Sequence, residues 1–232
     1  MNYKTELHCH SAGVSACARI KPAEIVEKYV AAGYSTVVLT NHLSFVTFSP
    51  DYYHGSFDWQ DKMNYYLDGY YRLKEAAGDR LHILLGAEAR IYEHEAADYL
   101  IYGATEDFLR THSSLLDTDF SAFSRCVRAA GLFLVQAHPF RDHMVVTEPK
   151  ELDAIEVYNG NEHCSSRNDM AEIWADRLHI KKTSGSDLHR PTDTACAGIR
   201  TEAPITTNEE LLSVLRSGNY TLIKEGANLR ED

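Results

Sequence analysis

The sequence is poor in cationic residues, and this argues against one broad class of partners. Lysine and arginine number 23 among 232 residues, against 34 aspartates and glutamates, so the formal net charge is −11 with histidine neutral. A protein that binds extended DNA or RNA relies on a basic groove that neutralises phosphates. We therefore expect no polymeric nucleic acid as a partner, and any anionic ligand must be held by a local site.

Long apolar runs and paired cysteines are also missing. No 18-residue apolar segment occurs, and the opening MNYKTELHCH has no basic stretch followed by an apolar run, so we expect neither a membrane span nor a secretory signal. The five cysteines show no CxxC spacing, which favours reduced thiols in the cytoplasm. No linker, low-complexity tract or repeat divides the chain, so we predict one domain over residues 1–232. Nothing in the sequence indicates an oligomeric state.

What is present is an alternation of short apolar runs with helical patterns. This alternation is typical of βα units that build a parallel sheet covered by helices. Helices are predicted from Pro22 to the stop at Gly33, along an apolar stripe from Trp59 to Ala77, and after a Thr207 capping box. Predicted strands cover residues 3–10, 36–40, 81–88, 99–103, 132–138, 154–157, 181–186 and 220–223.

Twelve histidines stand out in the composition, and several of them fall at predicted strand ends. His8 and His10 are two apart on the first strand, so both imidazoles point to the same face. Later strands also end in groups that bind metals, namely His42, Glu88, His138, Asp187 and His189. The carboxyl ends of parallel barrel strands meet at one mouth, so we expect these groups to converge there. Imidazoles and carboxylates suit zinc, iron or manganese.

Five segments that contain these residues resemble, in the same order, the motifs of the PHP (polymerase and histidinol phosphatase) family. They are ELHCHS, TNH, GAE, QAHP and GSDLH. The resemblance implies an α/β fold, a distorted (β/α)7 TIM-like barrel, with two or three divalent metal ions at the C-terminal mouth and phosphoesterase activity. It also implies that one metal takes His8, His10, Glu88 and Asp187, that Glu88 bridges to a second metal bound by His138, and that His42 and His189 belong to a third.

The chain departs from the family pattern in two places. A family acid or histidine soon after the first motif is replaced by Ala16 and Cys17, so a third-metal ligand is absent or Cys17 substitutes for it. A family histidine that closes the fourth strand corresponds to Thr105, and His112 follows as either a ligand or a loop residue. The remaining histidines, at positions 54, 82, 94, 143, 163 and 179, are interpreted as surface or core residues.

The expected chemistry is hydrolysis. We hypothesise that a metal-bridging water, held by Glu88 and Asp187, attacks phosphorus in a two-metal site. Arg141, Arg19 and Arg190 are candidates for binding the phosphate, and each could instead form a surface or structural ion pair. Because several divalent cations dominate the local field, an anionic substrate is compatible with the acidic composition.

A small-molecule phosphate monoester, as used by histidinol phosphatases, is the expected substrate. Nucleotide and phosphotyrosine phosphatases of the same superfamily remain open, as do an amidohydrolase-type hydrolase and a non-enzymatic accessory barrel. The loop at residues 44–57 is interpreted either as a lid beside a pocket or as a plain surface loop. The aromatic segment at residues 44–71 could stack on a ring-bearing leaving group.

Overall fold

The structure is a computed structural model, and it describes residues 3–92 and 96–226. Within this part of the chain the strands are β1 (Tyr3–Cys9), β2 (Tyr34–Leu39), β3 (His42–Leu43), β4 (His82–Ala89), β5 (Tyr99–Tyr102), β6 (Phe133–Gln136), β7 (Ala154–Asn159), β8 (Lys181–Gly185), β9 (Ala197–Thr201) and β10 (Thr221–Lys224). The helices are α1 (Pro22–Ala31), α2 (Trp59–Ala77), α3 (Glu106–Thr111), α4 (Phe120–Ala129), α5 (Asn168–Leu178) and α6 (Asn208–Ser217), with a short 3₁₀ helix at Pro149–Glu151.

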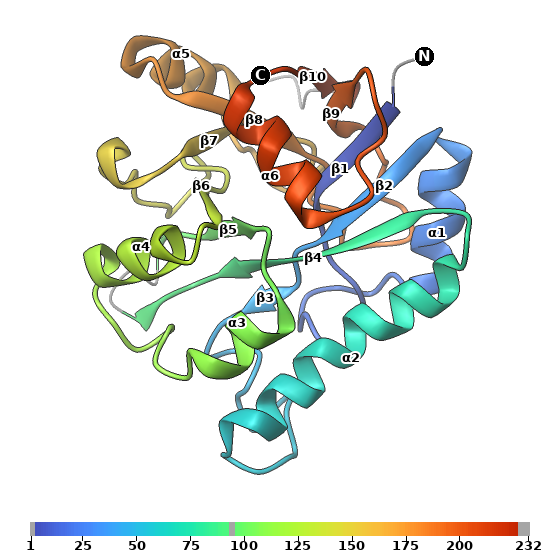
Figure 1. Cartoon of the computed structure of the whole chain (residues 1–232), viewed down its shortest axis with the longest axis vertical. Helices are drawn as coiled ribbons and strands as arrows, with labels where there is room; N and C mark the ends of the chain where they lie inside the picture. Colours follow the sequence, from blue (N-terminus) through green and yellow to red (C-terminus); the bar gives the residue numbers. More distant parts are fainter. Residues whose placement is uncertain (1–2, 93–95, 227–232) are drawn as a thin grey trace.

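The strands form one sheet that curls into a nearly closed barrel (Figure 1). Its order is β10-β9-β1-β2-β4-β5-β6-β7-β8, and β3 pairs with β4 at the side. The loop after β8 then returns to β1, where the Asp187 backbone N–H donates to the His8 carbonyl at 2.8 Å and the His10 N–H donates to the Leu188 carbonyl at 3.1 Å. The predicted α/β barrel is confirmed, and its closure falls beside the His8–His10 pair.

The sheet is mixed, so the prediction of a fully parallel barrel was wrong at β5. This strand runs antiparallel to both β4 and β6, and β9 and β10 are antiparallel additions beside β1. A parallel return needs a crossover of about a dozen residues or more. Only residues 90–98 separate β4 from β5, so the chain must turn back. The start of β5, instead of its end, therefore lies at the C-terminal mouth of the neighbouring strands.

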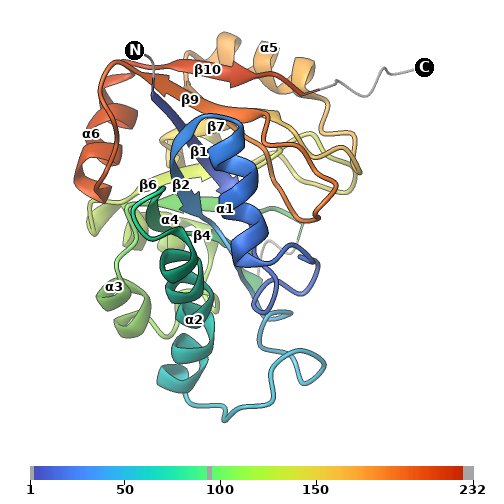
Figure 2. The same cartoon turned by 90° about the vertical axis from the view of Figure 1, so that its right-hand side faces the viewer.

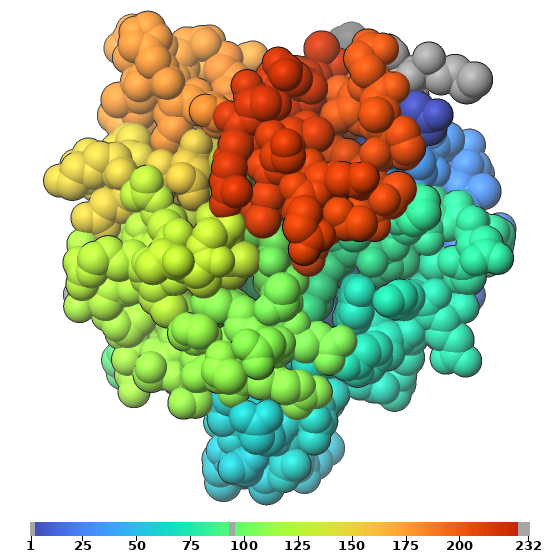
Figure 3. All heavy atoms as spheres, in the orientation of Figure 1, coloured from blue at the N-terminus to red at the C-terminus, as the bar shows by residue number. Residues whose placement is uncertain are grey.

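The barrel interior is filled by apolar side chains and closed at one end by α6. Leu7, Val38 and Val135 from three strands pack in one cluster with Leu211 and Leu215 of α6. Figure 1 places α6 across the barrel, and Figure 3 shows the C-terminal segment, in red, covering the centre of this face. The carboxyl ends of β1, β2 and β4 lie at the opposite end, which is left for the polar site.

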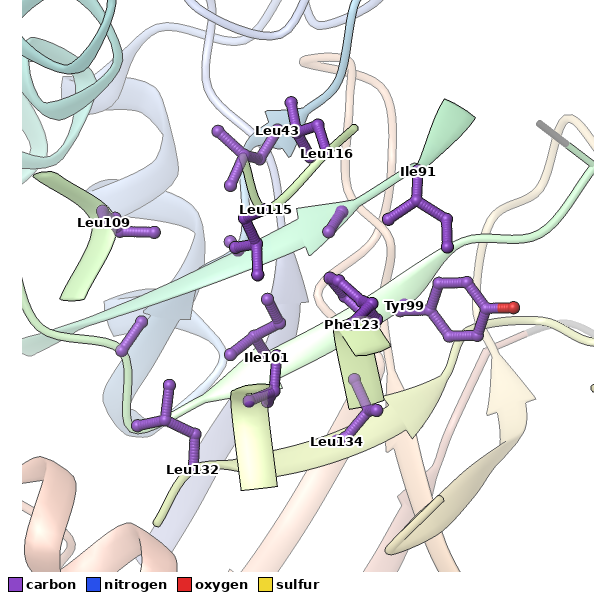
Figure 4. Packing of buried hydrophobic residues seen from close by; sticks show 14 of the residues in the cluster. Leu43, Ile91, Tyr99, Ile101, Leu109, Leu115, Leu116, Phe123, Leu132 and Leu134 are labelled. Atoms are coloured by element: carbon purple, nitrogen blue, oxygen red, sulfur yellow. The ribbon is translucent and has the colours of Figure 1, made fainter. Parts of the chain in front are cut away.

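Helices cover the outer surface of the barrel. Figure 4 shows Ile101 and Leu134 from neighbouring strands packing against Phe123 of α4 and against Leu115. On the other side α1 and α2 contact each other and the strands beneath them (Figure 2). Burying one such leucine or phenylalanine contributes about 1.5–3 kcal/mol. This outer packing holds the strand ends of the site in place.

The predicted helices are confirmed at their ends. Pro22 is the first residue of α1, Asp58 caps α2 by accepting the Gln60 backbone N–H at 2.8 Å, and Thr207 forms the capping box of α6. None of the helices in residues 3–92 and 96–226 is both long enough and apolar enough to cross a bilayer.

Candidate metal centre

All seven predicted ligands meet at the mouth of the barrel. Five of them line a cavity of about 240 Å³, and the other two, His8 and His10, are fully buried against the Glu88 carboxylate. The described residues that line this cavity are Cys17, His42, Glu88, Arg90, Asp98, His138, Arg141, Met144, Asn161, His163, Cys164, Asp187, His189 and Arg190. The strand ends therefore converge as the βα pattern predicts, despite the reversal at β5.

Glu88 lies at the centre of this arrangement. Its Oε1 atom is 3.3 Å from His8 Nε2 and 3.0 Å from His138 Nε2, while Oε2 is 3.3 Å from His10 Nε2 and 2.8 Å from His42 Nδ1. Burial raises the pKa of this carboxyl, but the charges of His42 and His8 outweigh it and hold the pKa of Glu88 well below its usual range. One buried carboxylate thus faces four imidazoles.

Asp187 is the second shared carboxylate. Its Oδ1 atom lies 3.3 Å from His8 Nε2, His10 Nε2 and His189 Nδ1, and its Oδ2 accepts a hydrogen bond from Arg141 Nη2 at 2.7 Å. Burial opposes ionisation, but the charges of His8 and Arg141 lower the pKa of Asp187 well below its usual value. Its φ of 50° lies in the left-handed region, a strained conformation for a residue with a side chain.

The buried imidazoles carry nitrogen atoms that the described side chains leave unsatisfied. His8 Nε2 and His10 Nε2 belong to fully buried side chains and have no hydrogen-bond partner, although carboxylate oxygens lie 3.3 Å away. A buried polar atom without a partner costs about 1–3 kcal/mol. A cation placed among these nitrogen and oxygen atoms would satisfy them, so the donor set fits the divalent metals that the motifs imply.

The potential ligand atoms fall into overlapping groups, within each of which they lie within 4.8 Å of one another. The groups are His8–His10–Glu88, His8–His138–Asp187, Glu88–Asp98–His138 and His10–His42–His189. The first group lies within the predicted first-metal set, and the second joins His8 and Asp187 of that set with His138, which was predicted at the second metal. The other two groups contain the residues predicted at the second and third positions.

Asp98 is a candidate ligand that the sequence analysis missed. It immediately precedes β5, is 2% exposed, and lies 3.9 Å from His138 Nε2 through its Oδ2 atom. Arg90 holds it with two hydrogen bonds of 2.7 and 2.6 Å. The sequence does show an acidic residue just before this strand. That position indicates a ligand only if β5 is antiparallel, because the start of the strand then lies at the mouth. Thr105, at the other end of β5, caps α3 through its bond from the Phe108 N–H.

The third group contains only imidazoles, with Cys17 beside it. The ring centroids of His42 and His189 lie 4.4 and 4.2 Å from that of His10. Desolvation, with the neighbouring His189 and His42, lowers the pKa of His10 well below its usual value. Desolvation raises the pKa of the Cys17 thiol, but hydrogen bonds with His189 and His42 outweigh it and lower the pKa to about 6.

A buried carboxylate behind the site orients the first-metal ligands. Glu156 Oε1 accepts a hydrogen bond from His8 Nδ1 at 2.9 Å, and Oε2 accepts bonds from the His138 backbone N–H and from Asn159 Nδ2, both at 3.0 Å. The bond to Nδ1 directs the other ring nitrogen of His8, Nε2, toward Glu88 and Asp187. Glu156 and Asn159 thus support the ligands from behind.

Glu6, from the first motif, ties two strand ends together beneath the ligands. Its carboxylate accepts bonds from the His8 and Ser186 backbone N–H groups at 2.8 and 2.9 Å, and from the Tyr29 hydroxyl at 2.8 Å. Burial dominates over these hydrogen bonds and raises the pKa of Glu6 to about 7. The residues that precede His8 and Asp187 are thereby held at a fixed separation.

Two other candidates lie away from the centre. Arg19 donates to the carbonyls of Ala16 and Ala18 in its own turn and is not among the described residues that line the cavity, so the structure does not bring it to the site. His112 ends α3, where its Nδ1 bonds to the Phe108 carbonyl at 2.8 Å and its ring packs on Phe108.

The histidines interpreted as surface residues divide into two sets. Those at positions 54, 82, 143 and 179 are exposed, as predicted, and His94 lies outside the described residues. His163 is exposed as well, as predicted, but it also lines the cavity, and its Nε2 lies 2.8 Å from Asp193 Oδ1. Its position after β7 follows from a loop that folds back over the mouth, which periodicity does not reveal.

The aromatic segment at residues 44–57 contributes nothing to the described lining of the cavity. Tyr53 and Phe48 are buried against each other, while Tyr52 and Phe57 are exposed. Figures 1 and 2 show this segment beside the N-terminal end of α2. The surface-loop alternative therefore accounts for it better than the lid.

Comparison with known proteins finds a family model that matches one segment of the chain and several solved structures with a similar fold. A family model described as PHP-associated matches residues 165–220. No curated protein matches the sequence. The fold is similar to PsfC from Pseudomonas syringae, with a TM-score of 0.71 and 15% identity over 99% of this chain and 94% of that one.

Two larger proteins share the fold as well. A two-domain protein of Bacteroides vulgatus containing a predicted PHP-like metal-dependent phosphoesterase has a TM-score of 0.67 and 16% identity over 97% of this chain. The lesion-specific endonuclease PfuEndoQ of Pyrococcus furiosus has a TM-score of 0.65 and 15% identity over 96% of this chain. The present chain spans 65% and 58% of the length of these two proteins.

Proposed function

We propose that this chain is a member of the PHP superfamily and a metal-dependent phosphoesterase that hydrolyses phosphate monoesters of small molecules. The observation that supports this proposal most strongly is the buried Glu88 carboxylate, which has imidazole nitrogens of four histidines within 3.3 Å. Partly unsatisfied polar atoms destabilise a buried core, whereas a multinuclear metal site requires them as ligands.

We assign the ligands to three positions. His8, His10, Glu88 and Asp187 would hold the first metal, and Glu88, Asp98 and His138 would hold the second. A third metal would be held by His42 and His189, with His10 also within reach. Cys17 lies beside His42 and His189. Zinc, iron or manganese at these positions would supply an activated water and neutralise phosphoryl oxygens.

The chain's own residues bind and orient the substrate. Three guanidinium groups line the cavity, those of Arg90, Arg141 and Arg190, and a guanidinium can grip a phosphate with two hydrogen bonds. Arg141 is anchored by Asp187 at 2.7 Å and by Asn159 at 2.8 Å, so its position is fixed before a substrate enters. Glu88 and Asp187 remain ionised at neutral pH because of the cations around them.

The dimensions of the site favour a small substrate. A cavity of about 240 Å³ accommodates a phosphate with a compact alcohol, and the net charge of −11 disfavours a nucleic acid polymer, although the Pyrococcus neighbour is an endonuclease. Histidinol phosphate, a nucleotide and a phosphotyrosine side chain all remain within this class. An amidohydrolase reaction is less well supported, because the cavity lining offers three guanidiniums suited to a phosphoryl group.

Release of inorganic phosphate by the metal-loaded protein tests the proposal. The parent, loaded in turn with zinc, manganese and iron(II), is incubated with a panel of phosphomonoesters, and with amide and lactone substrates for comparison. Asp187→Asn is the test variant, and Glu209→Gln, on the exposed face of α6, is the matched control. We expect phosphate release by the parent and the control only. Hydrolysis of amides alone, or equal rates for parent and Asp187→Asn, would contradict the proposal.

A further inference from the structure

Hydrolysis of an unactivated phosphate ester needs a proton donor for the departing oxygen. This inference rests on the proposed function. The carboxylates at the site are poorly suited to that task, because Glu88 and Asp187 have low pKa values and are assigned to metals. Asp187 also accepts a hydrogen bond from Arg141 on its second oxygen. The donor must therefore be a different group that faces the same cavity.

Few side chains of the described lining satisfy this requirement. Guanidinium groups do not release protons in proteins. The Cys17 thiol is engaged with the metal-position residues His42 and His189. His163 is the one imidazole in the described lining that belongs to none of the ligand groups. Cys164 is the other lining residue with a transferable proton, and it is exposed.

His163 is held in place by a fixed carboxylate. Its Nε2 atom lies 2.8 Å from Oδ1 of Asp193, which is buried. The other oxygen of Asp193 accepts the backbone N–H groups of His189 and Arg190, each at 2.8 Å. The imidazole is thus attached, through Asp193, to the loop that presents His189 to the metal position. A carboxylate that binds one ring nitrogen fixes the orientation of the other, as in hydrolase dyads.

We propose that His163, oriented by Asp193, is the general acid that protonates the leaving oxygen. Because Nε2 faces Asp193, the transferable proton is on Nδ1. As water oxygen forms its bond to phosphorus, the bond from phosphorus to the ester oxygen breaks, and that oxygen keeps the electron pair and takes the Nδ1 proton. The attacking water gives up its own proton to solvent. The His163 side chain is 34% exposed, so it recovers a proton from bulk water for the next turnover.

The dependence on leaving group distinguishes this role from a structural one. An alkyl ester such as β-glycerol phosphate releases a basic alkoxide that needs a proton, whereas p-nitrophenyl phosphate releases a stable phenolate. His163→Asn should lower kcat for the alkyl ester by about 10²–10⁴-fold, the usual contribution of a general acid. For p-nitrophenyl phosphate it should leave kcat near the parent value. The alkaline limb of the kcat–pH profile for the alkyl ester should also disappear.

Cys164→Ser, at the neighbouring lining position, is the matched control and should hydrolyse both esters like the parent. Metal content is measured for every protein by elemental analysis. Equal loss of rate on both esters, loss of metal from His163→Asn, or a selective loss in Cys164→Ser would overturn the proposal while leaving the phosphoesterase function intact. A metal-loaded parent that hydrolyses no ester would instead refute the proposed function, and the inference with it.

Discussion

Replacement of Glu156 by glutamine should weaken metal binding although Glu156 touches no metal position. The carboxylate has two acceptor oxygens, one bound to His8 Nδ1 and the other to the His138 backbone N–H and to Asn159 Nδ2. Glutamine has only one acceptor oxygen, and its NH₂ group must face one of these two sets of donors. Glutamate and glutamine have almost the same side-chain volume, so the substitution tests hydrogen bonding alone.

Both orientations of the glutamine amide carry a cost. If its oxygen faces His8, then the His138 N–H and Asn159 lose their acceptor inside the protein. If its oxygen faces His138, then His8 Nδ1 must become the acceptor, and the ring proton moves to Nε2, the atom that the metal needs. Loss of such a supporting carboxylate typically weakens metal binding about 10–100-fold. This corresponds to about 1.4–2.8 kcal/mol of binding free energy.

Competition with a chromophoric chelator at fixed pH measures this change. Glu156→Gln and the parent are titrated with zinc, and Glu209→Gln at the opposite end of the barrel serves as the control. Circular dichroism of the metal-free proteins establishes that the variant is folded. A folded Glu156→Gln protein whose zinc affinity equals that of the parent would refute the view that Glu156 sets the orientation of His8.

Four further perturbations follow from the geometry of the site. Asp98→Asn should lower the number of bound metals by one with little change in the fold, as counted by elemental analysis. Cobalt(II) bound by the parent should show a thiolate charge-transfer band in the near ultraviolet that Cys17→Ser loses and Cys164→Ser keeps; an unchanged band in Cys17→Ser would exclude that thiol as a ligand. Burial lowers the pKa of His8, but the surrounding carboxylates outweigh it and raise the pKa well above the usual value. A metal ion must therefore displace a proton from His8, and calorimetry should show the metal affinity falling as pH falls. The pKa of Glu6 is raised from 4.5 to about 7, so its contribution to stability is complete below about pH 4.5 and is lost as pH rises through about 7. This loss amounts to about 3 kcal/mol in the free energy of unfolding. Thermal unfolding as a function of pH should show it in the parent and not in Glu6→Gln.

The predictable part of the site follows from strand periodicity. His8 and His10 share a face because side chains alternate, and His138 and Asp187 follow buried strands whose apolar runs are evident in the sequence. Each of these inferences needs only local information. The convergence of the strand ends then follows from barrel closure.

The parts that could not be predicted depend on chain direction and on loops. Because β5 is reversed, Asp98 lies at the mouth of the barrel and Thr105 lies away from it. No local sequence pattern distinguishes a parallel strand of four residues from an antiparallel one. His163 reaches the cavity through a loop whose path is fixed by tertiary hydrogen bonds, such as the one with Asp193. Arg19 lies close to a predicted ligand segment, yet its own turn supplies the carbonyls that bind it.

The most direct test of the central claim is an anomalous-scattering map from crystals of the zinc- or manganese-loaded protein, collected at the absorption edge of the metal. We expect at least two peaks within coordination distance of Glu88, about 2.0–2.2 Å from its oxygens for zinc. A map without a peak at Glu88, from crystals whose solution sample binds metal, would contradict the assignment of this carboxylate as the bridge of a multinuclear centre.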